Sequence, residues 1–308
     1  MLTPEERFSI GIKVLERLKG RQSIYRAGPR SQKASPYGSD EDTGRNHDEA
    51  APLEFEGYGS GRPEGHTSLD SGTIPRLADL VSHSGPFDPY SILLGACEDG
   101  LPFTLDLTDS SPGSLLIVGD PASGKTRLLH SILSSVALIN RPSEVSYSLI
   151  VRGPQEFEGL HTSPHCQQVI PLDEISHTNV LEEYAAIVEQ RRRGSANGPA
   201  VLLAVDDLAL FLQLLNKENF LRFYALVKHG PRYRVWVIAT TAAQDIELID
   251  EHILSSFRTR LIGNIITAGL AAYITGTNNS EATHLLPGSQ FCVPFEGGWL
   301  RFWIPAEN

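Results

Sequence analysis

The segment that most constrains the fold is residues 119–126, which read GDPASGKT. It follows the apolar run at residues 115–118 and comes directly before a helical pattern. A glycine-containing loop between a strand and a helix lets backbone N–H groups surround a phosphate, with the positive end of the helix behind them. The pattern therefore predicts a phosphate-binding loop in an α/β fold. The alternative is a strand-to-helix turn that matches the motif by chance.

The loop sequence also predicts which residues contact the nucleotide and its metal ion. We expect Lys125 to place its charge on the β- and γ-phosphates of ATP, as a catalytic residue, and the Thr126 hydroxyl to bind Mg²⁺. The candidate nucleotide-binding residues are Gly119, Asp120, Pro121, Ala122, Ser123, Gly124, Lys125, Thr126, Arg127 and Thr240.

A second apolar run, residues 200–205, ends in Asp206 and Asp207. Carboxylates at the carboxyl end of a parallel strand point into the crevice where α/β proteins bind ligands. Asp206 is therefore the predicted Mg²⁺ partner of Thr126, and Asp207 is the candidate that polarises the attacking water. The alternative is that the Asp-Asp pair only caps the helix that follows.

Composition narrows the class of protein. With 41% hydrophobic and 20% charged residues, the 308-residue chain can bury the core of one large domain. No apolar stretch reaches transmembrane length, the charged N-terminus lacks a signal-peptide pattern, and the three cysteines are widely spaced, so we expect a cytoplasmic protein. The net charge of −11 argues against a surface that coats nucleic acid, but it leaves room for a local basic channel.

The chain divides into three predicted parts. A capping box at Thr3-Pro4-Glu5-Glu6 and helically spaced apolar residues predict a short amphipathic helix over residues 1–20. Residues 21–75 are rich in Ser, Gly, Pro, Asp and Glu, which is typical of a disordered linker. Residues 76–308 are predicted to form the folded domain. The first helix is either a docking helix for a partner or a helix that lies on its own domain.

Strand and helix patterns alternate through the folded part. Hairpins are predicted at residues 91–107 and 289–304, one at each end of the domain. Between them, strand-like runs at residues 115–118, 145–151, 200–205 and 235–239 are separated by helical patterns. This order predicts an α/β fold with a mainly parallel, doubly wound sheet and a flexible N-terminal extension.

Four segments taken in order resemble the motor domain of the FtsK/SpoIIIE group of ring translocases, within the HerA-like class. They are LGACEDGLPFTLDL, FEGLHTSPHCQQVIPLDEISHTNVLEEYAAIVEQRRR, RVWVIATTAAQDIELIDEHILSSFRTRL and HLLPGSQFCVP. The resemblance covers residues 90–305 and implies a RecA-like P-loop NTPase domain that assembles as a homo-oligomer, a hexameric ring. The loop followed by an Asp-Asp strand is also similar to the ATPase modules of EccC, the FtsK-like component of type VII secretion.

The chain departs from the FtsK pattern at two site positions. The family usually has Asp-Glu where this chain has Asp206-Asp207, and Ala-Thr-Gln where it has Ala239-Thr240-Thr241. The resemblance implies that Thr240 or Thr241 senses the γ-phosphate. It also implies that Arg260, which matches the family's Thr-Arg, reaches the site of a neighbouring subunit. An ordinary surface ion pair is the alternative for Arg260.

Two classes of function fit these features. The first is an enzyme, an ATP-hydrolysing ring motor that translocates double-stranded DNA. The alternative is an ATP-binding assembly or protein-secretion module with weak or no hydrolysis, which recruits a protein partner through the N-terminal helix. DNA-stimulated ATPase activity distinguishes the first from the second.

Overall fold

The computed structural model describes residues 13–14, 74–172, 177–194, 198–277, 281–295 and 298–306. Lys13 and Val14 form a two-residue strand within the segment where a helix is predicted over residues 1–20. The rest of that helix and the linker predicted over residues 21–75, apart from its last two residues, lie outside the described residues.

The described strands form one mixed sheet in the order β1-β3-β2-β11-β10-β9-β4-β8-β7-β5-β6. Their bounds are β1 (Lys13–Val14), β2 (Ser91–Cys97), β3 (Pro102–Asp106), β4 (Leu115–Gly119), β5 (Val145–Val151), β6 (Cys166–Pro171), β7 (Ala200–Val205), β8 (Val235–Ala242), β9 (Thr259–Ile262), β10 (Gln290–Phe295) and β11 (Gly298–Trp303). The block from β9 to β6 is parallel, and the two predicted hairpins continue the sheet as antiparallel strands. The predicted α/β fold with a mostly parallel sheet is confirmed.

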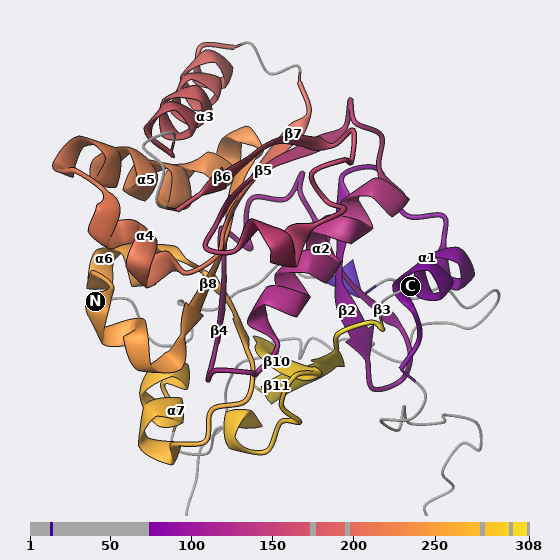
Figure 1. Ribbon diagram of the computed structural model, residues 1–308. Coiled ribbons are helices and arrows are strands. Elements are labelled where there is room, and N and C mark those ends of the chain that lie inside the picture. Colours follow the sequence, from indigo (N-terminus) through magenta and orange to yellow (C-terminus); the bar gives the residue numbers. More distant parts are fainter. Residues whose placement is uncertain are drawn as a thin grey trace, which may run out of the picture. The chain divides into compact units, whose positions relative to one another are not determined.

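Helices cover both faces of this sheet (Figure 1). Their bounds are α1 (Leu77–Ser84), α2 (Lys125–Ile139), α3 (His177–Arg192), α4 (Leu208–Leu214), α5 (Lys217–His229), α6 (Glu251–Ser256) and α7 (Ala268–Thr275). Short 3-10 helices are η2 (Pro154–Phe157), η3 (Gly230–Tyr233), η4 (Ala243–Leu248) and η5 (Glu281–Thr283).

Two apolar layers hold the helices to the parallel strands. Because side chains alternate along a strand, Ile117 of β4 faces α2 while Val118 faces the α3–α6 side. β7 is buried on both faces over its full length, as its unbroken apolar run predicts. Helix α2, which follows the phosphate loop, therefore packs with α1 and η2 on one face of the sheet. Helices α3 to α6 pack on the other face (Figure 1).

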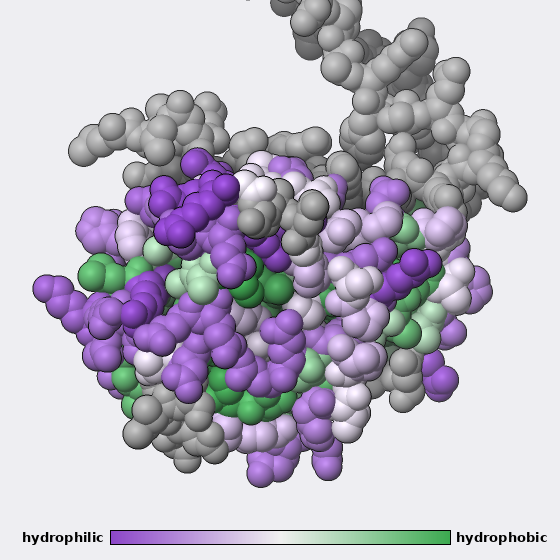
Figure 2. All heavy atoms as spheres, turned by 90° about the horizontal axis from the view of Figure 1, so that it is seen from above, coloured by the Kyte–Doolittle hydropathy of each residue, from purple (hydrophilic) through white to green (hydrophobic). Residues whose placement is uncertain are grey.

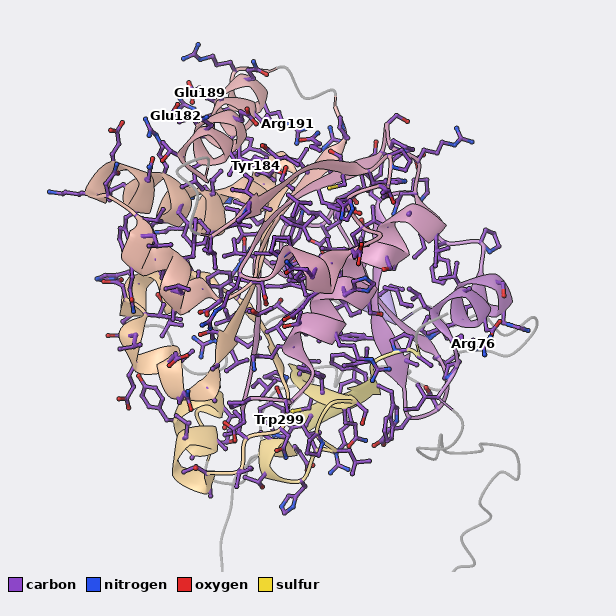
Figure 3. The ribbon with its side chains drawn as sticks, in the orientation of Figure 1. Arg76, Glu182, Tyr184, Glu189, Arg191 and Trp299 are labelled. Atoms are coloured by element: carbon purple, nitrogen blue, oxygen red, sulfur yellow. The ribbon has the colours of Figure 1, made fainter. Side chains whose placement is uncertain are left out.

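Helix α3 shows how the second layer is attached. The Tyr184 hydroxyl reaches into the sheet and donates to Leu202 O at 2.9 Å, and Arg191 donates to three backbone carbonyl oxygens beyond the helix end, including Tyr233 O at 2.6 Å. Glu182 pairs with Arg222 of α5 at 3.0 Å. Figure 3 shows the labelled α3 side chains, and the face above them is mainly hydrophilic (Figure 2).

The order of elements differs from the prediction in two places. The single helix expected after Asp207 is broken into α4 and α5, because the Asn216 side chain caps α5 by accepting from Asn219 N at 2.9 Å. Strands β6 and β9 were not predicted, and each is short or only partly buried. Among the described residues, no helix has both the length and the apolar character needed to cross a bilayer.

Candidate nucleotide-binding site

The phosphate loop lies where the sheet is most constrained. Strand β4 is fully buried and pairs in parallel with β8 on one side and β9 on the other, so its carboxyl end is fixed between two neighbours. Helix α2 begins at Lys125, immediately after Gly124. Its first N–H groups have no helical partner and face the loop, which is the arrangement that binds a phosphate.

Backbone conformation explains the two glycines of the motif. Gly124 has φ 95°, and a Cβ there would lie 3.0 Å from the Gly288 carbonyl. At Gly119 a Cβ would lie 2.4 Å from Ser123 Oγ, too close for any side chain. The loop has this tight path only because both positions lack a side chain. Ala122, at φ 62°, adopts the same left-handed region at some cost.

Lys125 points back into its own loop. Its Nζ donates to Gly119 O at 3.0 Å and to Asp120 O at 2.9 Å. Burial lowers the pKa of Lys125, while the surrounding carboxylates, Asp206 first, act in the opposite direction. The ammonium group is thus held over the hollow of the loop by neutral carbonyls, and phosphate oxygens are stronger partners for it.

Other loop residues brace the loop instead of facing a ligand. Asp120 is tied to the segment after β9: its Oδ2 accepts from Ile266 N at 2.8 Å, and its N–H donates to Asn264 O at 2.9 Å. The Arg127 guanidinium donates to Gly288 O at 3.1 Å. Both side chains were predicted to bind nucleotide, and in this structure both are bound to the protein. The buried Ser123 hydroxyl has no hydrogen-bond partner among the described residues.

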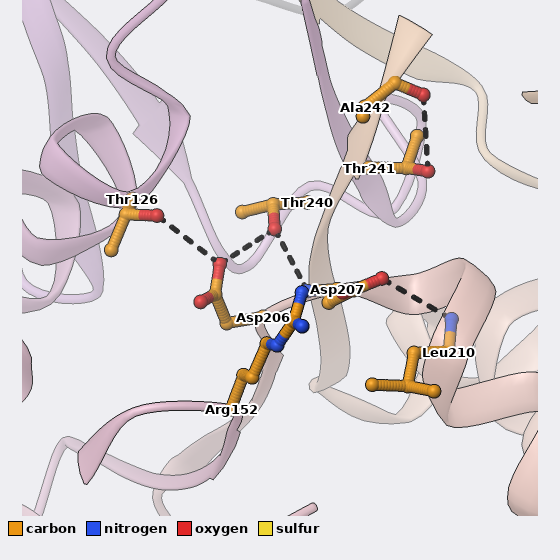
Figure 4. Close-up of polar contacts among 8 residues, drawn as sticks. All are labelled: Thr126, Arg152, Asp206, Asp207, Leu210, Thr240, Thr241 and Ala242. Atoms are coloured by element: carbon orange, nitrogen blue, oxygen red, sulfur yellow. Dashed lines mark hydrogen bonds and ion pairs between the residues drawn. The ribbon is translucent and has the colours of Figure 1, made fainter. Parts of the chain in front are cut away.

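Three oxygen-bearing side chains, those of Thr126, Asp206 and Thr240, meet at the end of the phosphate loop (Figure 4). Asp206 Oδ1 accepts from the Thr240 hydroxyl at 2.7 Å and lies 3.5 Å from the Thr126 hydroxyl. Asp206 is buried, and burial raises its pKa, an effect to which the charges of Glu156 and Asp207 add; the Thr240 hydrogen bond opposes it.

A hydroxyl and a carboxylate at this spacing fit Mg²⁺, which takes oxygen ligands and leaves several positions to water and phosphate. Thr126 and Asp206 are the residues that would hold the ion. Its positive charge would offset the cost of keeping Asp206 ionised in a buried place. Among the described residues, no group of three or more His, Cys, Asp or Glu side chains is placed to hold a metal ion.

Comparisons with known proteins agree with this geometry. Residues 87–197 match the model of the FtsK/SpoIIIE family. The matched segment contains the phosphate loop, and it is similar to an FtsK/SpoIIIE-family P-loop ATPase domain. It is also similar to the EccC secretion ATPases: EccC5 of the ESX-5 secretion system of Mycobacterium marinum is 33% identical over an alignment of 168 positions, which covers 46% of this chain and 12% of that protein. The chain therefore spans a small part of the length of this relative.

Solved structures show the same fold. ATPases 2 and 3 of Thermomonospora curvata EccC, in complex with a signal sequence peptide, superpose with a TM-score of 0.60 at 15% identity, covering 78% of this chain and 44% of that one. The pCW3 conjugation coupling protein TcpA, a monomer form with ATPγS, gives a TM-score of 0.60 at 13% identity, with 77% and 71% covered.

Asp207 has a different position in this FtsK-like domain from the one expected of a catalytic carboxylate. Its Oδ1 accepts from Leu210 N at 3.2 Å and so caps α4, while Oδ2 lies 3.5 Å from Arg152 Nη1 (Figure 4). Its backbone has φ 72°, a left-handed conformation that turns the side chain onto the helix. The alternative interpretation of this residue, as a helix cap, is the geometry observed.

The two threonines at the end of β8 face opposite sides of the sheet. Thr240 Oγ1 accepts from Asp207 N at 3.0 Å and donates to Asp206, so it joins the two acids. Among the described residues, the Thr241 hydroxyl has one hydrogen-bond partner, its neighbour Ala242 O, at 3.4 Å (Figure 4). Thr240 is therefore the residue placed to sense the site, and the prediction for Thr241 is not supported by its orientation.

Arg260 is not brought to the phosphate loop. It lies on β9 beside Leu116, near the start of the parallel strands, and the loop lies at their other end. Its guanidinium donates to Leu254 O at 3.1 Å and Ile274 O at 3.2 Å, and burial lowers its pKa. A guanidinium held in this way joins β9 to α6 and α7, and in this structure it is directed to its own chain and not to the site of a neighbouring subunit.

The sequence analysis missed the residues that follow β5. Arg152 pairs with Asp207, and the charge of Glu156 is one of the causes that raise the pKa of Asp206. Their position along the chain could have indicated these residues. Strands β5 and β7 are parallel neighbours, so the loops that follow them lie at the same edge of the sheet.

Proposed function

We propose that this domain is an EccC-like module that binds ATP with Mg²⁺, hydrolyses it slowly and uses the nucleotide to control contact with a protein partner. The observation that carries the proposal is the contrast within the site. The phosphate loop and the Thr126–Asp206 pair are complete, whereas the Asp207 carboxylate is held by a helix end and by Arg152. Such a site favours a long-lived ATP state over rapid turnover.

A protein partner fits the chain better than double-stranded DNA. The relative matched in sequence is a secretion ATPase, and one similar solved structure holds a signal sequence peptide. The net charge of −11 opposes close approach of a polyanion. We therefore take the secretion-type alternative and not the DNA translocase. We further propose that residues 76–308 form the ATPase domain, that it works in the ATP-rich cytoplasm, and that ATP favours a homo-oligomeric, hexameric ring.

The test compares two partners on one protein. Full-length chain is titrated with MgATPγS, and its ATPase rate is measured alone, with a secretion-signal peptide and with duplex DNA. We expect nucleotide binding, a low basal rate, a response to peptide and none to DNA. Nucleotide-dependent assembly is followed by sedimentation velocity. Stimulation by DNA alone, or a lack of nucleotide binding, would contradict the proposal.

A further inference from the structure

Arg152 lies directly after β5, beside the acidic pair that follows β7. In the parallel register of these strands Ile150 lies opposite Val205, and Asp206 N donates to Ile150 O at 2.8 Å. Arg152 is two residues beyond Ile150, and Asp207 is two residues beyond Val205. Because side chains alternate along a strand, both are directed to the same face of the sheet. The pairing of β5 with β7 therefore brings Arg152 to Asp207.

The two carboxylate oxygens of Asp207 have different partners. Oδ1 accepts from Leu210 N at 3.2 Å and caps α4, whereas Oδ2 lies 3.5 Å from Arg152 Nη1 (Figure 4). The backbone N–H of Asp207 donates to Thr240 Oγ1 at 3.0 Å, and the Thr240 hydroxyl donates to Asp206, the residue that would hold Mg²⁺. These contacts place Asp207 in the site, and Oδ2 is the oxygen left for a water molecule when Arg152 is absent.

The contact between Arg152 and Asp207 is an exposed one. The Arg152 side chain is 73% exposed and the Asp207 side chain 25%, and among the described residues this ion pair is the one side-chain contact of Arg152. An exposed pair of this kind shifts an equilibrium by no more than about fivefold, and salt weakens it. Arg152 therefore restrains Oδ2 without fixing it permanently.

We infer that Arg152 restrains the Asp207 carboxylate and so keeps the basal hydrolysis of ATP slow. The inference rests on the proposed function, in which this domain hydrolyses ATP slowly. While the ion pair is formed, the guanidinium competes with water for Oδ2. Arg152 is thus a positioning residue, because it acts through Asp207 and not on the nucleotide.

Release of Oδ2 allows the reaction to proceed. The water oxygen forms a bond to the γ-phosphorus while the bond from that phosphorus to the β–γ bridging oxygen breaks, and the electron pair of that bond remains on ADP. The water proton passes to Asp207 Oδ2 and from there to solvent, leaving ADP and inorganic phosphate. Oδ1 continues to cap α4 throughout, so the carboxylate needs no rearrangement of the helix.

The experiment separates nucleotide binding from turnover in the full chain. Affinity for a fluorescent ATP analogue with Mg²⁺ and single-turnover phosphate release at saturating ATP are measured for wild type, Arg152→Ala and Arg152→Lys. We expect Arg152→Ala to bind within about twofold of wild type and to release phosphate about three- to fivefold faster, the factor that an exposed ion pair supplies. Arg152→Lys keeps the positive charge, so its rate should lie nearer to that of wild type.

Two comparisons show whether the effect passes through Asp207. In an Asp207→Asn background, which keeps a capping oxygen but removes the charge, Arg152→Ala should change the rate by less than about 1.5-fold. Arg193→Ala is the matched control and should behave as wild type, because Arg193 is 75% exposed and pairs with Glu189 on α3.

Salt provides a readout that a merely structural role would not move. Raising the salt concentration from about 0.05 M to about 0.5 M screens the ion pair of the wild type, whereas Arg152→Ala has no such pair to lose. The ratio of the two rates of phosphate release should therefore approach one at high salt.

Each contrary result has one meaning. Phosphate release by Arg152→Ala at the wild-type rate or below overturns the inference, and a slower rate means that Arg152 contacts the nucleotide itself. A gain that persists in the Asp207→Asn background or at high salt, or that Arg193→Ala shares, also overturns it. If wild type and Arg152→Ala both bind ATP but release no phosphate, the restraint is refuted and nucleotide binding stands. Wild type that does not bind ATP refutes the proposed function.

Discussion

The phosphate loop and the acidic corner after β7 lie at the same edge of the sheet, yet they use their polar groups differently. In the loop, the main-chain N–H groups at the start of α2 have no helical partner, and among the described residues Lys125 Nζ is hydrogen-bonded to two neutral carbonyls. At the corner, Asp206 and Asp207 are engaged by Thr240, Leu210 N and Arg152. The phosphate loop is therefore arranged to bind an anion. At the acidic corner, the Asp207 carboxylate instead contributes to the stability of the fold.

The difference shows that the phosphate loop depends on backbone geometry, whereas the acidic corner depends on what each side chain contacts. The loop depends on glycines at positions where a Cβ collides with protein atoms. The corner depends on a carboxylate, which serves equally well as a helix cap, a metal ligand or a base. Capping and catalysis compete for the same two oxygens, and Asp207 caps.

The largest effect is expected at Lys125. Replacing Lys125 with Ala should weaken MgATP binding at least about 100-fold, or about 2.7 kcal/mol, because the phosphates lose their positive partner in a half-buried site. Isothermal titration calorimetry measures it, with Lys228→Ala as the control on an exposed lysine that lies over the Tyr224 ring. Equal affinity in the Lys125 variant would mean that the loop is not a nucleotide site.

A backbone test of the loop comes next. Gly124→Ala should destabilise the fold by about 1–3 kcal/mol, because φ 95° disfavours a side chain and the new Cβ meets Gly288. Gly269→Ala in α7 is the matched control: nothing lies within 4 Å of its Cβ position, so it should be neutral or slightly stabilising. Urea unfolding compares them, and similar losses in both variants would show that loop strain is unimportant.

Loss of the helix cap at the acidic corner should lower the stability of the fold by less than the Gly124→Ala change. Asp207→Ala removes the acceptor for Leu210 N and should cost about 1 kcal/mol, whereas Asp207→Asn keeps a capping oxygen and tolerates the left-handed backbone. Thermal unfolding of the pair distinguishes them. If Asp207→Ala is as stable as Asp207→Asn, the residue is not a working cap, and its carboxylate becomes available for catalysis again.

The smallest effect concerns charge burial. Burial raises the pKa of Asp206 in the folded state, so folding favours the protonated carboxyl. The ionised carboxylate therefore lowers the free energy of unfolding at pH values above the folded-state pKa. This destabilisation disappears at pH values below the unfolded-state pKa. Asp206→Asn should therefore stabilise the nucleotide-free protein at neutral pH, by up to about 1 kcal/mol.

That gain should shrink as the pH falls and the wild-type carboxylate takes up a proton. Unfolding curves across pH measure it, and Mg²⁺-dependent ATP binding should weaken in the same variant. A gain that persists unchanged at acid pH would show that something other than charge causes it.

Much of the fold could be predicted because its signals are local. The unbroken apolar run of β7, the loop between β4 and α2 and both hairpins have patterns that each segment carries by itself. Strands β6 and β9 escaped prediction because pairing with a neighbouring strand, and not a strong apolar run, makes them strands. The α4–α5 break depends on one capping side chain, Asn216, inside an otherwise helical pattern.

The site divides in the same way. The sequence could predict the location of Lys125, Thr126 and Asp206 in the site. Each of them lies at the start of a helix or just after a strand, within a recognisable motif. The correct threonine at the end of β8 required the direction of its side chain, and the role of Arg260 required its two carbonyl partners. Motif spacing says which residues share an edge of the sheet, but not which way each one turns.

The amino-acid sequence by itself determined that this chain builds a phosphate loop on a parallel sheet, because glycine spacing and apolar runs act over a few residues. Only the tertiary structure decided how each of the two acids after β7 is used. Asp206 is hydrogen-bonded by the Thr240 hydroxyl of the neighbouring strand, whereas Asp207 has a left-handed backbone and accepts from Leu210 N as the cap of α4. The motif places both residues at the end of one strand, but the direction of each side chain depends on contacts with segments that are distant in the sequence.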